Sequence, residues 1–345
     1  MNLVNETQAV NQQHQLTLLL AYLHMHDYQF TTISPSSHEK VNNRPENKMA
    51  NNLEDIFGWN RPFKRETVDA VLFDLMQSAN IVTQVDNGWR SQLRVSSVAG
   101  KLFLHAAFPT HDNDAVFFGP DSYRFANVIN QYFATNKQPI HRAVDIGTGS
   151  GIGAVMMSLA LSKSNQKFKS DFQSGAEPEF EVIAVDINNL ALNLASVNMA
   201  AANVHHISLM HSNLLKNVAG NFDLIIANPP YLLDASERTY RHGGGQLGAA
   251  LSLDIVDAAI QRLNPNGTLL LYTGVAIVNG KDAFLAEVKV KLDVAGFSYK
   301  YREIDPDIFG EELNGEAYNM ADRIAAVVLT AQKNAHQIFK FLPVN

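Results

Sequence analysis

The chain has 345 residues, a net charge of -7 and no cysteine. Without cysteine, disulfides, thiolate metal sites and cysteine nucleophiles are excluded. The acidic balance leaves no overall excess of the basic side chains that supply most of the affinity for a nucleic-acid backbone. Residues 1–15 lack the basic and apolar regions of a secretory signal, and no apolar run is long enough to cross a bilayer. We therefore expect a cytoplasmic protein that makes no contact with a membrane.

The first third of the chain is predicted to contain three parts. Residues 1–33 are expected to form a helical segment, and residues 34–52 a polar linker with two prolines and five asparagines. Residues 53–115 are predicted to form a small α+β domain with a helix over 65–78 and strands over 81–85, 89–95 and 101–108, the first two joined by a turn at 86–88. This domain resembles half of a winged-helix unit. Its charges are nearly balanced, so we interpret it as a substrate-orienting domain.

From residue 116 to residue 345 short apolar runs alternate with amphipathic segments. Strands are predicted over 143–146, 181–187, 207–211, 222–227 and 268–273, and helices over 152–162, 190–202, 247–263 and 281–295. Apolar strands separated by helices predict a parallel sheet covered on both faces. Two further strands, over 297–304 and 323–331, have no helix between them and predict an antiparallel end. The predicted fold class is therefore α/β, with a Rossmann-like sheet of seven strands.

A glycine-rich turn follows the first predicted strand, with the sequence Asp145-Ile146-Gly147-Thr148-Gly149-Ser150-Gly151. Glycine permits positive φ and close approach of a ligand, and the start of the next helix offers free N–H groups. A dinucleotide-binding turn has much the same pattern, so the turn alone is a weak signal. We predict that Asp145, Gly147, Thr148, Gly149 and Gly151 bind a nucleoside cofactor.

An acidic residue ends the second predicted strand. Asp186, followed by Ile187, could accept hydrogen bonds from both ribose hydroxyls of such a cofactor. Its distance from the glycine turn is about twice the usual ~20 residues, which the polar stretch 162–179 explains as a surface insertion. Capping of the next helix is an alternative role, which Asn188 could also fill. Asn213, after the third strand, is a candidate near the adenine.

The sequence Asn228-Pro229-Pro230-Tyr231 follows the fourth predicted strand. Two prolines fix an extended turn and lack N–H groups, so hydrogen-bond acceptors remain. The Asn228 amide oxygen and the Pro229 carbonyl could hold the two N–H groups of a planar nitrogen and favour its loss of planarity during attack. Tyr231 could stack on the planar group. A stiff loop would explain one proline but not these four residues at this place.

The order of glycine turn, acidic strand end and Asn-Pro-Pro-Tyr resembles the class I S-adenosylmethionine-dependent methyltransferases that act on amide or exocyclic nitrogens. Over residues 116–331 it resembles the HemK-like branch, the protein glutamine N5-methyltransferases of release factors. This resemblance implies S-adenosyl-L-methionine as cofactor, no metal, and methyl transfer to a planar nitrogen. It makes residues 228–231 the catalytic sequence, with Asn228 also next to the cofactor.

The substrate side departs from the branch. Tyr123 stands where the branch has the Glu of a Pro-x-Thr-Glu-like element, and Gly243 or His242 replaces an Asp that precedes a glycine pair. Tentative substrate contacts are Pro120, Tyr123, Arg241, His242 and Gly244. The expected acceptor is a protein glutamine-type amide or a small molecule.

Three alternatives stay open. An RNA or DNA adenine N6-methyltransferase would use the same four residues, but the acidic charge disfavours a nucleic-acid partner. A small-molecule methyltransferase would fit the altered substrate elements. An NAD-dependent oxidoreductase could use the glycine turn, but it offers Asn-Pro-Pro-Tyr no role.

Overall fold

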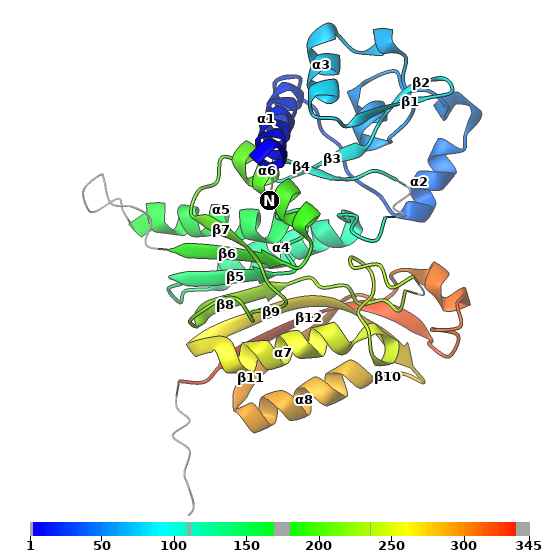
Figure 1. The fold of residues 1–345 in the computed structure, drawn as a ribbon. Helices are drawn as coiled ribbons and strands as arrows, with labels where there is room; N and C mark the ends of the chain where they lie inside the picture. Colours follow the sequence, from blue (N-terminus) through cyan, green and yellow to red (C-terminus); the bar gives the residue numbers. More distant parts are fainter. Residues whose placement is uncertain (1–2, 109–111, 169–179, 235, 336–345) are drawn as a thin grey trace, which may run out of the picture.

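The computed structural model describes residues 3–108, 112–168, 180–234 and 236–335. A large central sheet is covered by helices on both faces, and the N-terminal third of the chain packs beyond one of these helical layers (Figure 1). Most of the predicted insertion, residues 169–179, lies outside the described residues. In the part of the chain that is described, no helix is long and apolar enough to cross a membrane.

The central sheet has the strand order β11-β12-β9-β8-β5-β6-β7. These strands are β5 (Arg142–Ile146), β6 (Glu181–Asp186), β7 (Ile207–His211), β8 (Phe222–Ala227), β9 (Leu263–Val278), β11 (Phe297–Asp305) and β12 (Arg323–Lys333). Strands β5 to β9 pair in parallel, whereas β12 lies antiparallel between β9 and β11. The two-residue β10 (Lys281–Asp282) pairs with the end of β9. The predicted Rossmann-like sheet with an antiparallel end is confirmed.

Helices cover both faces of this sheet because its strands are apolar on both sides. One layer contains α4 (Pro120–Thr135), α5 (Ile152–Phe168) and α6 (Asn189–Ala201), and the other contains α7 (Ala250–Arg262) and α8 (Ala283–Ala295). On β5, Ala143 packs in the core of the first layer, and Val144 and Ile146 pack in the core of the second. Helix α4 was not predicted from the sequence. Helix α7 begins three residues later than predicted, because positive φ angles at Gly244, Gly245, Leu247 and Gly248 form a turn before it.

The N-terminal third contains two small antiparallel sheets beside its helices. Its elements are α1 (Leu3–Met25), α2 (Pro35–Asn42), α3 (Ala70–Ser78), β1 (Val82–Val85), β2 (Gly88–Ser91), β3 (Leu93–Val98) and β4 (Lys101–Ala106). Short 3-10 or π turns cover Pro45–Asn47, Glu54–Gly58 and Arg65–Thr67. Two more 3-10 turns lie at Gln246–Gly248 and Gly310–Asn314, in the part of the chain that contains the central sheet. The predicted hairpin forms between β1 and β2. The strand predicted over 89–95 is wrong in one respect: it breaks at Gln92, and β3 pairs with β4 in a separate sheet.

The polar linker predicted over 34–52 is also wrong. Ser34 caps α2 by accepting a hydrogen bond from the Ser37 N–H, and Pro35 occupies the first turn, where its missing N–H costs nothing. His38 and Ala50 are buried, so this segment packs against the domain. Capping chemistry, rather than hydrophobic periodicity, carries the helical signal here.

Helix α6 joins the N-terminal third to the central sheet. Its residues Ala191, Leu194 and Val197 pack in the same core as α1 and the segment 53–104. The amide of Asn198, which is fully buried, accepts a hydrogen bond from the Leu104 N–H at 2.8 Å and donates to the carbonyls of Leu104 and Ser150 at 3.0 and 2.9 Å. One side chain thereby bonds the edge of β4 and the end of the glycine turn.

We expect Asn198→Ala to lower the free energy of unfolding by about 2–4 kcal/mol, because three buried backbone groups would lose their partner. Urea denaturation measures this change. Asn193→Ala, at an exposed position of the same helix, is the control and should change stability by less than about 0.5 kcal/mol. Equal effects of the two substitutions would contradict the bridging role of Asn198.

Candidate functional site

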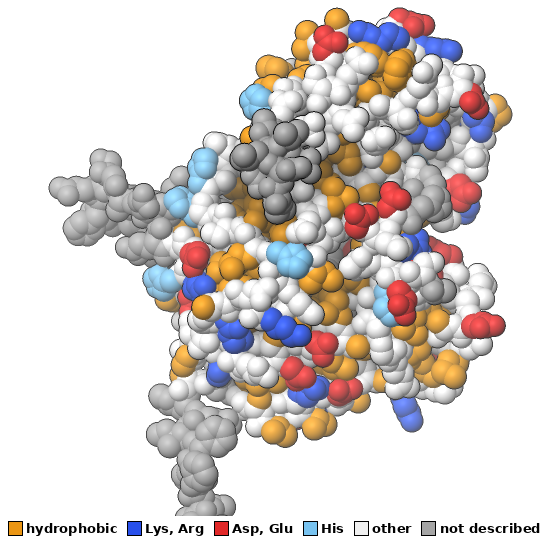
Figure 2. Space-filling model, in the orientation of Figure 1, with side chains coloured by type: hydrophobic (Ala, Val, Ile, Leu, Met, Phe, Trp, Pro, Cys, Tyr) orange, Lys and Arg blue, Asp and Glu red, His pale blue; other side chains and the backbone are white. Residues whose placement is uncertain are grey.

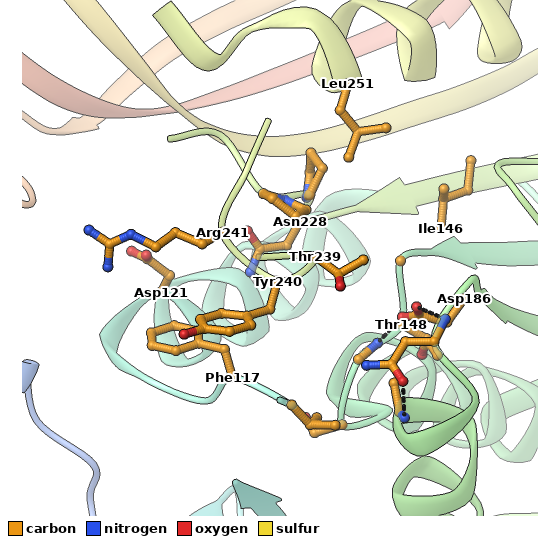
Figure 3. A pocket seen from close by; sticks show the side chains of 18 of the residues that line it. Phe117, Asp121, Ile146, Thr148, Asp186, Asn228, Thr239, Tyr240, Arg241 and Leu251 are labelled. Carbon is orange, nitrogen blue, oxygen red and sulfur yellow. Dashed lines mark hydrogen bonds between the residues drawn. The ribbon is translucent and has the colours of Figure 1, made fainter. Parts of the chain in front are cut away.

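A cavity of about 390 Å³ lies at the carboxyl ends of β5, β6 and β8. Carboxyl ends of neighbouring parallel strands meet at one edge of a sheet, where ligands of α/β folds usually bind. Figure 3 shows Asn228 between two groups of side chains: Asp186 and Thr148 on one side, and Phe117, Tyr240 and Asp121 on the other. The cavity therefore has two halves, one at the glycine turn and one beside residues 117–121 and 239–241.

The glycine turn faces open space at two of its three glycines. Gly147 and Gly149 have φ angles of +71° and +53°, and a Cβ atom at either would meet no atom within 4 Å. These two glycines leave room for a ligand against the backbone. Gly151, which was also predicted to bind the cofactor, does not line the cavity. Its φ is +84°, and a Cβ would lie 3.1 Å from that of Ala195, so this glycine allows α6 to pack closely.

Asp145 is buried beneath the turn, with 2% of its surface exposed. Its carboxylate accepts hydrogen bonds from the Thr148 hydroxyl at 2.7 Å and from the Ala154 N–H, in the first turn of α5, at 3.0 Å. Burial raises the pKa of Asp145 to about 7, although both hydrogen bonds oppose this shift. Asp145 also lines the cavity, so it links the shape of the turn to the ligand space.

Asp186 lines the cavity at the end of β6. Its two carboxylate oxygens accept hydrogen bonds from the N–H groups of Gly149 and Asn188, each at 2.9 Å. Burial raises the pKa of Asp186 despite these bonds. Asn188 caps α6, as the sequence allowed, by accepting from the Leu190 N–H at 2.9 Å. Asp186 is therefore not needed as the cap.

Two other predicted cofactor contacts, Ile187 and Asn213, also line this half of the cavity. Both side chains are exposed, so they are available to a ligand. Asn213 follows β7, and Ile187 follows β6, so they come from neighbouring strand ends. The structure thus brings together all the predicted residues on the cofactor side except Gly151.

Residues 228–231 line the cavity directly after β8. Backbone bonds of the next residues fix this turn: the Leu232 N–H donates to the Arg241 carbonyl at 3.1 Å, and the Gly243 N–H donates to the Leu232 carbonyl at 2.8 Å. A Cβ on Gly243 would lie 2.1 Å from the Gly248 carbonyl oxygen and 2.8 Å from that of Pro230. The glycine run therefore packs against the Asn-Pro-Pro-Tyr turn itself.

Tyr231 is held by a buried carboxylate that the sequence analysis did not single out. Its hydroxyl donates to Asp121 at 2.5 Å, and the hydroxyl of Tyr272 on β9 donates to the other oxygen of Asp121, also at 2.5 Å. Asp121 is only 4% exposed and pairs with Arg124 at 3.1 Å. Burial, reinforced by the Asp121 charge, raises the pKa of Tyr231 well above its ordinary range. The tyrosine ring thus has a fixed position in the cavity wall.

Of the five tentative substrate contacts, only Arg241 lines the cavity. Its guanidinium pairs with Glu312 and lies 3.5 Å from Asp234, so its charge is already compensated. His242 instead accepts a hydrogen bond from the Asp234 N–H through its Nδ1 atom, at 3.2 Å. An anionic ligand would have to compete with Glu312 and Asp234 for the Arg241 guanidinium.

Pro120, Tyr123 and Gly244, like His242, do not line the cavity. Pro120 begins α4. The Tyr123 hydroxyl accepts from the Thr32 N–H at 2.8 Å and so ties α4 to the N-terminal third. The acidic residue of this element that reaches the cavity is Asp121, two positions before Tyr123.

In the half of the cavity beside residues 117–121 and 239–241, several lining residues were not predicted from the sequence. Phe117 and Tyr240 lie face to face, with ring centroids 6.2 Å apart and planes 8° from parallel. Tyr240 belongs to a loop held by Thr239, whose N–H and hydroxyl both donate to the Asn113 carbonyl, at 3.1 and 2.6 Å. These loops lie far apart in the chain and carry no motif, so no local pattern could have paired them. Among the described residues, no group of three or more His, Asp or Glu is placed to hold a metal ion.

Comparison with known proteins agrees with this geometry. The family described as "Methyltransferase small domain" matches residues 126–275. Over these residues the chain is similar to that family. The release factor glutamine methyltransferase of Lactococcus lactis is 28% identical over 54% of this chain, and the ribosomal protein uL3 glutamine methyltransferase of Neisseria gonorrhoeae is 30% identical over 39%. The predicted resemblance to protein glutamine methyltransferases is confirmed.

The similarity covers only part of this chain and only part of each relative. It spans 63% of the Lactococcus protein and 44% of the Neisseria protein. Among solved structures, the ribosomal protein L11 methylase from Lactobacillus delbrueckii subsp. bulgaricus is 20% identical, with a TM-score of 0.39. That alignment covers 61% of this chain and 80% of the methylase. The match to the methyltransferase small domain begins at residue 126 and so does not include the N-terminal third.

The buried carboxyl of Asp145 should make stability depend on pH. Its pKa is raised from ~3.9 in the unfolded chain to about 7 in the folded protein. Between these values the unfolded chain ionises while the folded protein keeps its proton, so stability falls as pH rises through this window. We expect the wild type to lose ~1–3 kcal/mol more than Asp145→Asn between pH 4.5 and 7.5. Denaturant titrations at each pH measure this, and parallel curves for the two proteins would refute it.

Proposed function

We propose that this chain is an S-adenosylmethionine-dependent N-methyltransferase that acts on a planar nitrogen, namely the side-chain amide of a protein glutamine. One observation carries the proposal. Asn228 lies in the same cavity as the glycine turn and Asp186, so a nucleoside cofactor and an acceptor nitrogen can meet there. The relatives named as glutamine methyltransferases support the amide acceptor.

The cofactor half fits the nucleoside end and the amino-acid end of such a cofactor. The open faces of Gly147 and Gly149 permit close approach of the ligand to the backbone. Asp186, Asn213 and Asp145 all line the cavity. We propose that Asp186 accepts from the ribose hydroxyls, that Asn213 contacts the adenine, and that Asp145 lies beneath the methionine end. When bound, S-adenosylmethionine supplies a methyl group on a sulfonium that is already a good leaving group.

The contribution of the chain is then mostly orientation and exclusion of water. Asn228 holds one N–H of the acceptor through its amide oxygen, and the Pro229 carbonyl holds the other. These acceptors aim the nitrogen lone pair and help it leave the plane of the amide. Tyr231 supports the acceptor plane, because Asp121 and Gly274 fix its ring; a Cβ at residue 274 would lie 2.3 Å from that ring.

The N-terminal third is proposed to select the acceptor. Its residues Pro35 and Phe108 line the cavity, followed by Phe117 at the junction with the catalytic domain. On the face shown in Figure 2, acidic and basic side chains are interspersed and no extended basic patch occurs. This surface supports a protein or small-molecule acceptor over a nucleic acid.

A heteroaromatic amine is the second candidate acceptor. The parallel rings of Phe117 and Tyr240 lie in the acceptor half, where flat side chains favour a flat ligand. An exocyclic amine on a ring also presents two N–H groups to Asn228 and Pro229.

Transfer of labelled methyl in a lysate distinguishes the candidates: a labelled product that protease removes supports the protein acceptor. Label lost only after nuclease treatment, or retained in small molecules, would replace it.

We expect one S-adenosylhomocysteine molecule to bind per chain, and Asp186→Ala to weaken this binding by about 1.5–3 kcal/mol, because a charged acceptor is lost. Isothermal titration calorimetry measures both values. Asp293→Ala removes an exposed carboxylate from α8 and should leave binding unchanged. Binding of NAD in place of S-adenosylhomocysteine would refute the cofactor assignment.

We expect Asn228→Ala to slow methyl transfer by about 10²–10³-fold, because one oriented acceptor is lost from a dry site. The affinity for S-adenosylhomocysteine should stay close to that of the wild type. Asn221→Ala, before the opposite end of β8, is the matched control and should keep full activity. If Asn228→Ala abolished cofactor binding along with activity, its assigned role toward the acceptor would be wrong.

A further inference from the structure

A second, smaller cavity of about 20 Å³ lies within the N-terminal third. Its wall includes four polar side chains, those of Thr32, His38, Arg94 and His105. All four are buried, with at most 4% of each residue exposed. A cavity of this size holds about one water molecule or one small ion. The side chains around it therefore decide which of the two it favours.

Arg94 brings a buried positive charge to this wall without a carboxylate partner. Its Nε donates to the Gly58 carbonyl at 2.8 Å, and one terminal nitrogen donates to the Thr32 hydroxyl at 3.2 Å. No acidic side chain among the described residues forms an ion pair with it. Burial lowers the pKa of Arg94 to about 10, so the group stays charged at neutral pH. A buried charge without a counter-ion is costly.

The hydrogen bonds that lead away from Arg94 do not end at a negative group. The His105 Nδ1 atom lies 3.1 Å from the Ala106 carbonyl, which can only accept, so this nitrogen carries the proton. The Nε2 atom of His105 then accepts from the Ser96 hydroxyl at 2.8 Å, and Ser96 accepts from Thr32 at 2.5 Å. Thr32 finally accepts from Arg94. All the hydrogen bonds in this series therefore run in the same direction, from Arg94 through Thr32, Ser96 and His105, and the last acceptor is the neutral Ala106 carbonyl.

His38 adds a second unsatisfied polar atom to the same wall. It is 1% exposed, and its buried Nε2 atom finds no hydrogen-bond partner within ordinary geometry. The Asn42 amide nitrogen lies 3.5 Å from the other ring nitrogen and donates to it when the ring proton is on Nε2. Burial and the nearby Arg94 charge lower the pKa of His38 to about 4, so the ring is neutral at pH 7. The wall of the cavity thus includes a fixed cation and a neutral imidazole whose Nε2 atom makes no hydrogen bond of ordinary geometry, although the Trp59 and Gly58 carbonyls lie near the ring.

We propose that this cavity is a binding site for a small oxyanion of carboxylate size, held by Arg94 and His38. A carboxylate would supply the missing counter-charge and the missing acceptor together, whereas a water molecule would supply only the second. The site shares Pro35, Phe108 and Phe117 with the wall of the large cavity. An acidic group bound there would therefore lie next to the acceptor half of the catalytic site.

The test uses the full chain and sodium formate, whose binding is read from the melting temperature at constant ionic strength. Formate at ten times its Kd should raise the Tm of the wild type by about 2 °C or more, because a ligand that binds only the folded state stabilises it. Arg94→Met should lose this rise. Lys101→Gln removes a positive charge from the neighbouring β4 and should keep it. An equal rise in wild type and Arg94→Met, or no rise in the wild type, would overturn the proposal.

Two further measurements keep the test decisive if Arg94→Met does not fold. His38→Phe retains a ring of similar shape and should weaken formate binding several-fold, measured by saturation transfer from the protein to the formate proton in NMR. If His38→Phe binds formate as the wild type does, the proposed site is wrong.

Butyrate distinguishes two sources of the carboxylate. Tighter binding of butyrate than of formate indicates an acidic group on a larger ligand that reaches past Phe117, and binding of formate alone indicates a free small anion.

Discussion

Two carboxylates fix the backbone of the glycine turn, and the large cavity at the carboxyl ends of the parallel strands depends on that turn. Asp145 holds it from below through Thr148 and the start of α5, and Asp186 holds it from the next strand through the Gly149 N–H. Burial removes water from both carboxylates and thereby raises the pKa of each. The turn is thereby preorganised, with its open faces at Gly147 and Gly149 directed to the ligand space rather than collapsed onto a neighbour.

A third buried carboxylate, Asp121, does the same for the acceptor half. It joins Tyr231, which follows β8, to Tyr272 on β9 and to Arg124 on α4. Three elements that lie far apart in the chain therefore meet on one side chain. Arg124 also pairs with Asp305 at the end of β11, at 2.6 Å, which extends the network to the antiparallel edge of the sheet. Rigid placement of the Asn-Pro-Pro-Tyr turn follows from this shared partner.

Local signals made most of the catalytic domain predictable. The apolar strands, the glycine turn, Asp186 and the Asn-Pro-Pro-Tyr sequence each combine a residue pattern with a position after a strand, so their convergence at one sheet edge followed from parallel topology. The N-terminal third and the acceptor half were harder to predict. Helix α2 depends on a capping serine and a proline, while Phe117, Asp121 and Tyr240 meet only through tertiary packing. The resemblance points to Tyr123 rather than Asp121, because a sequence motif does not show which side of a helix faces the cavity.

The insertion of β12 between β9 and β11 has a consequence for the order in which the chain can fold during synthesis. Strand β9 is paired on one side by β8 as soon as it is made, but ten of its residues must wait for β12, which is synthesised about fifty residues later. Until then a long, buried and strongly apolar strand has an unpaired edge, the kind of surface that recruits other chains. A nascent protein that stalls after α8 would therefore carry most of the residues that line the large cavity beside an open, aggregation-prone edge.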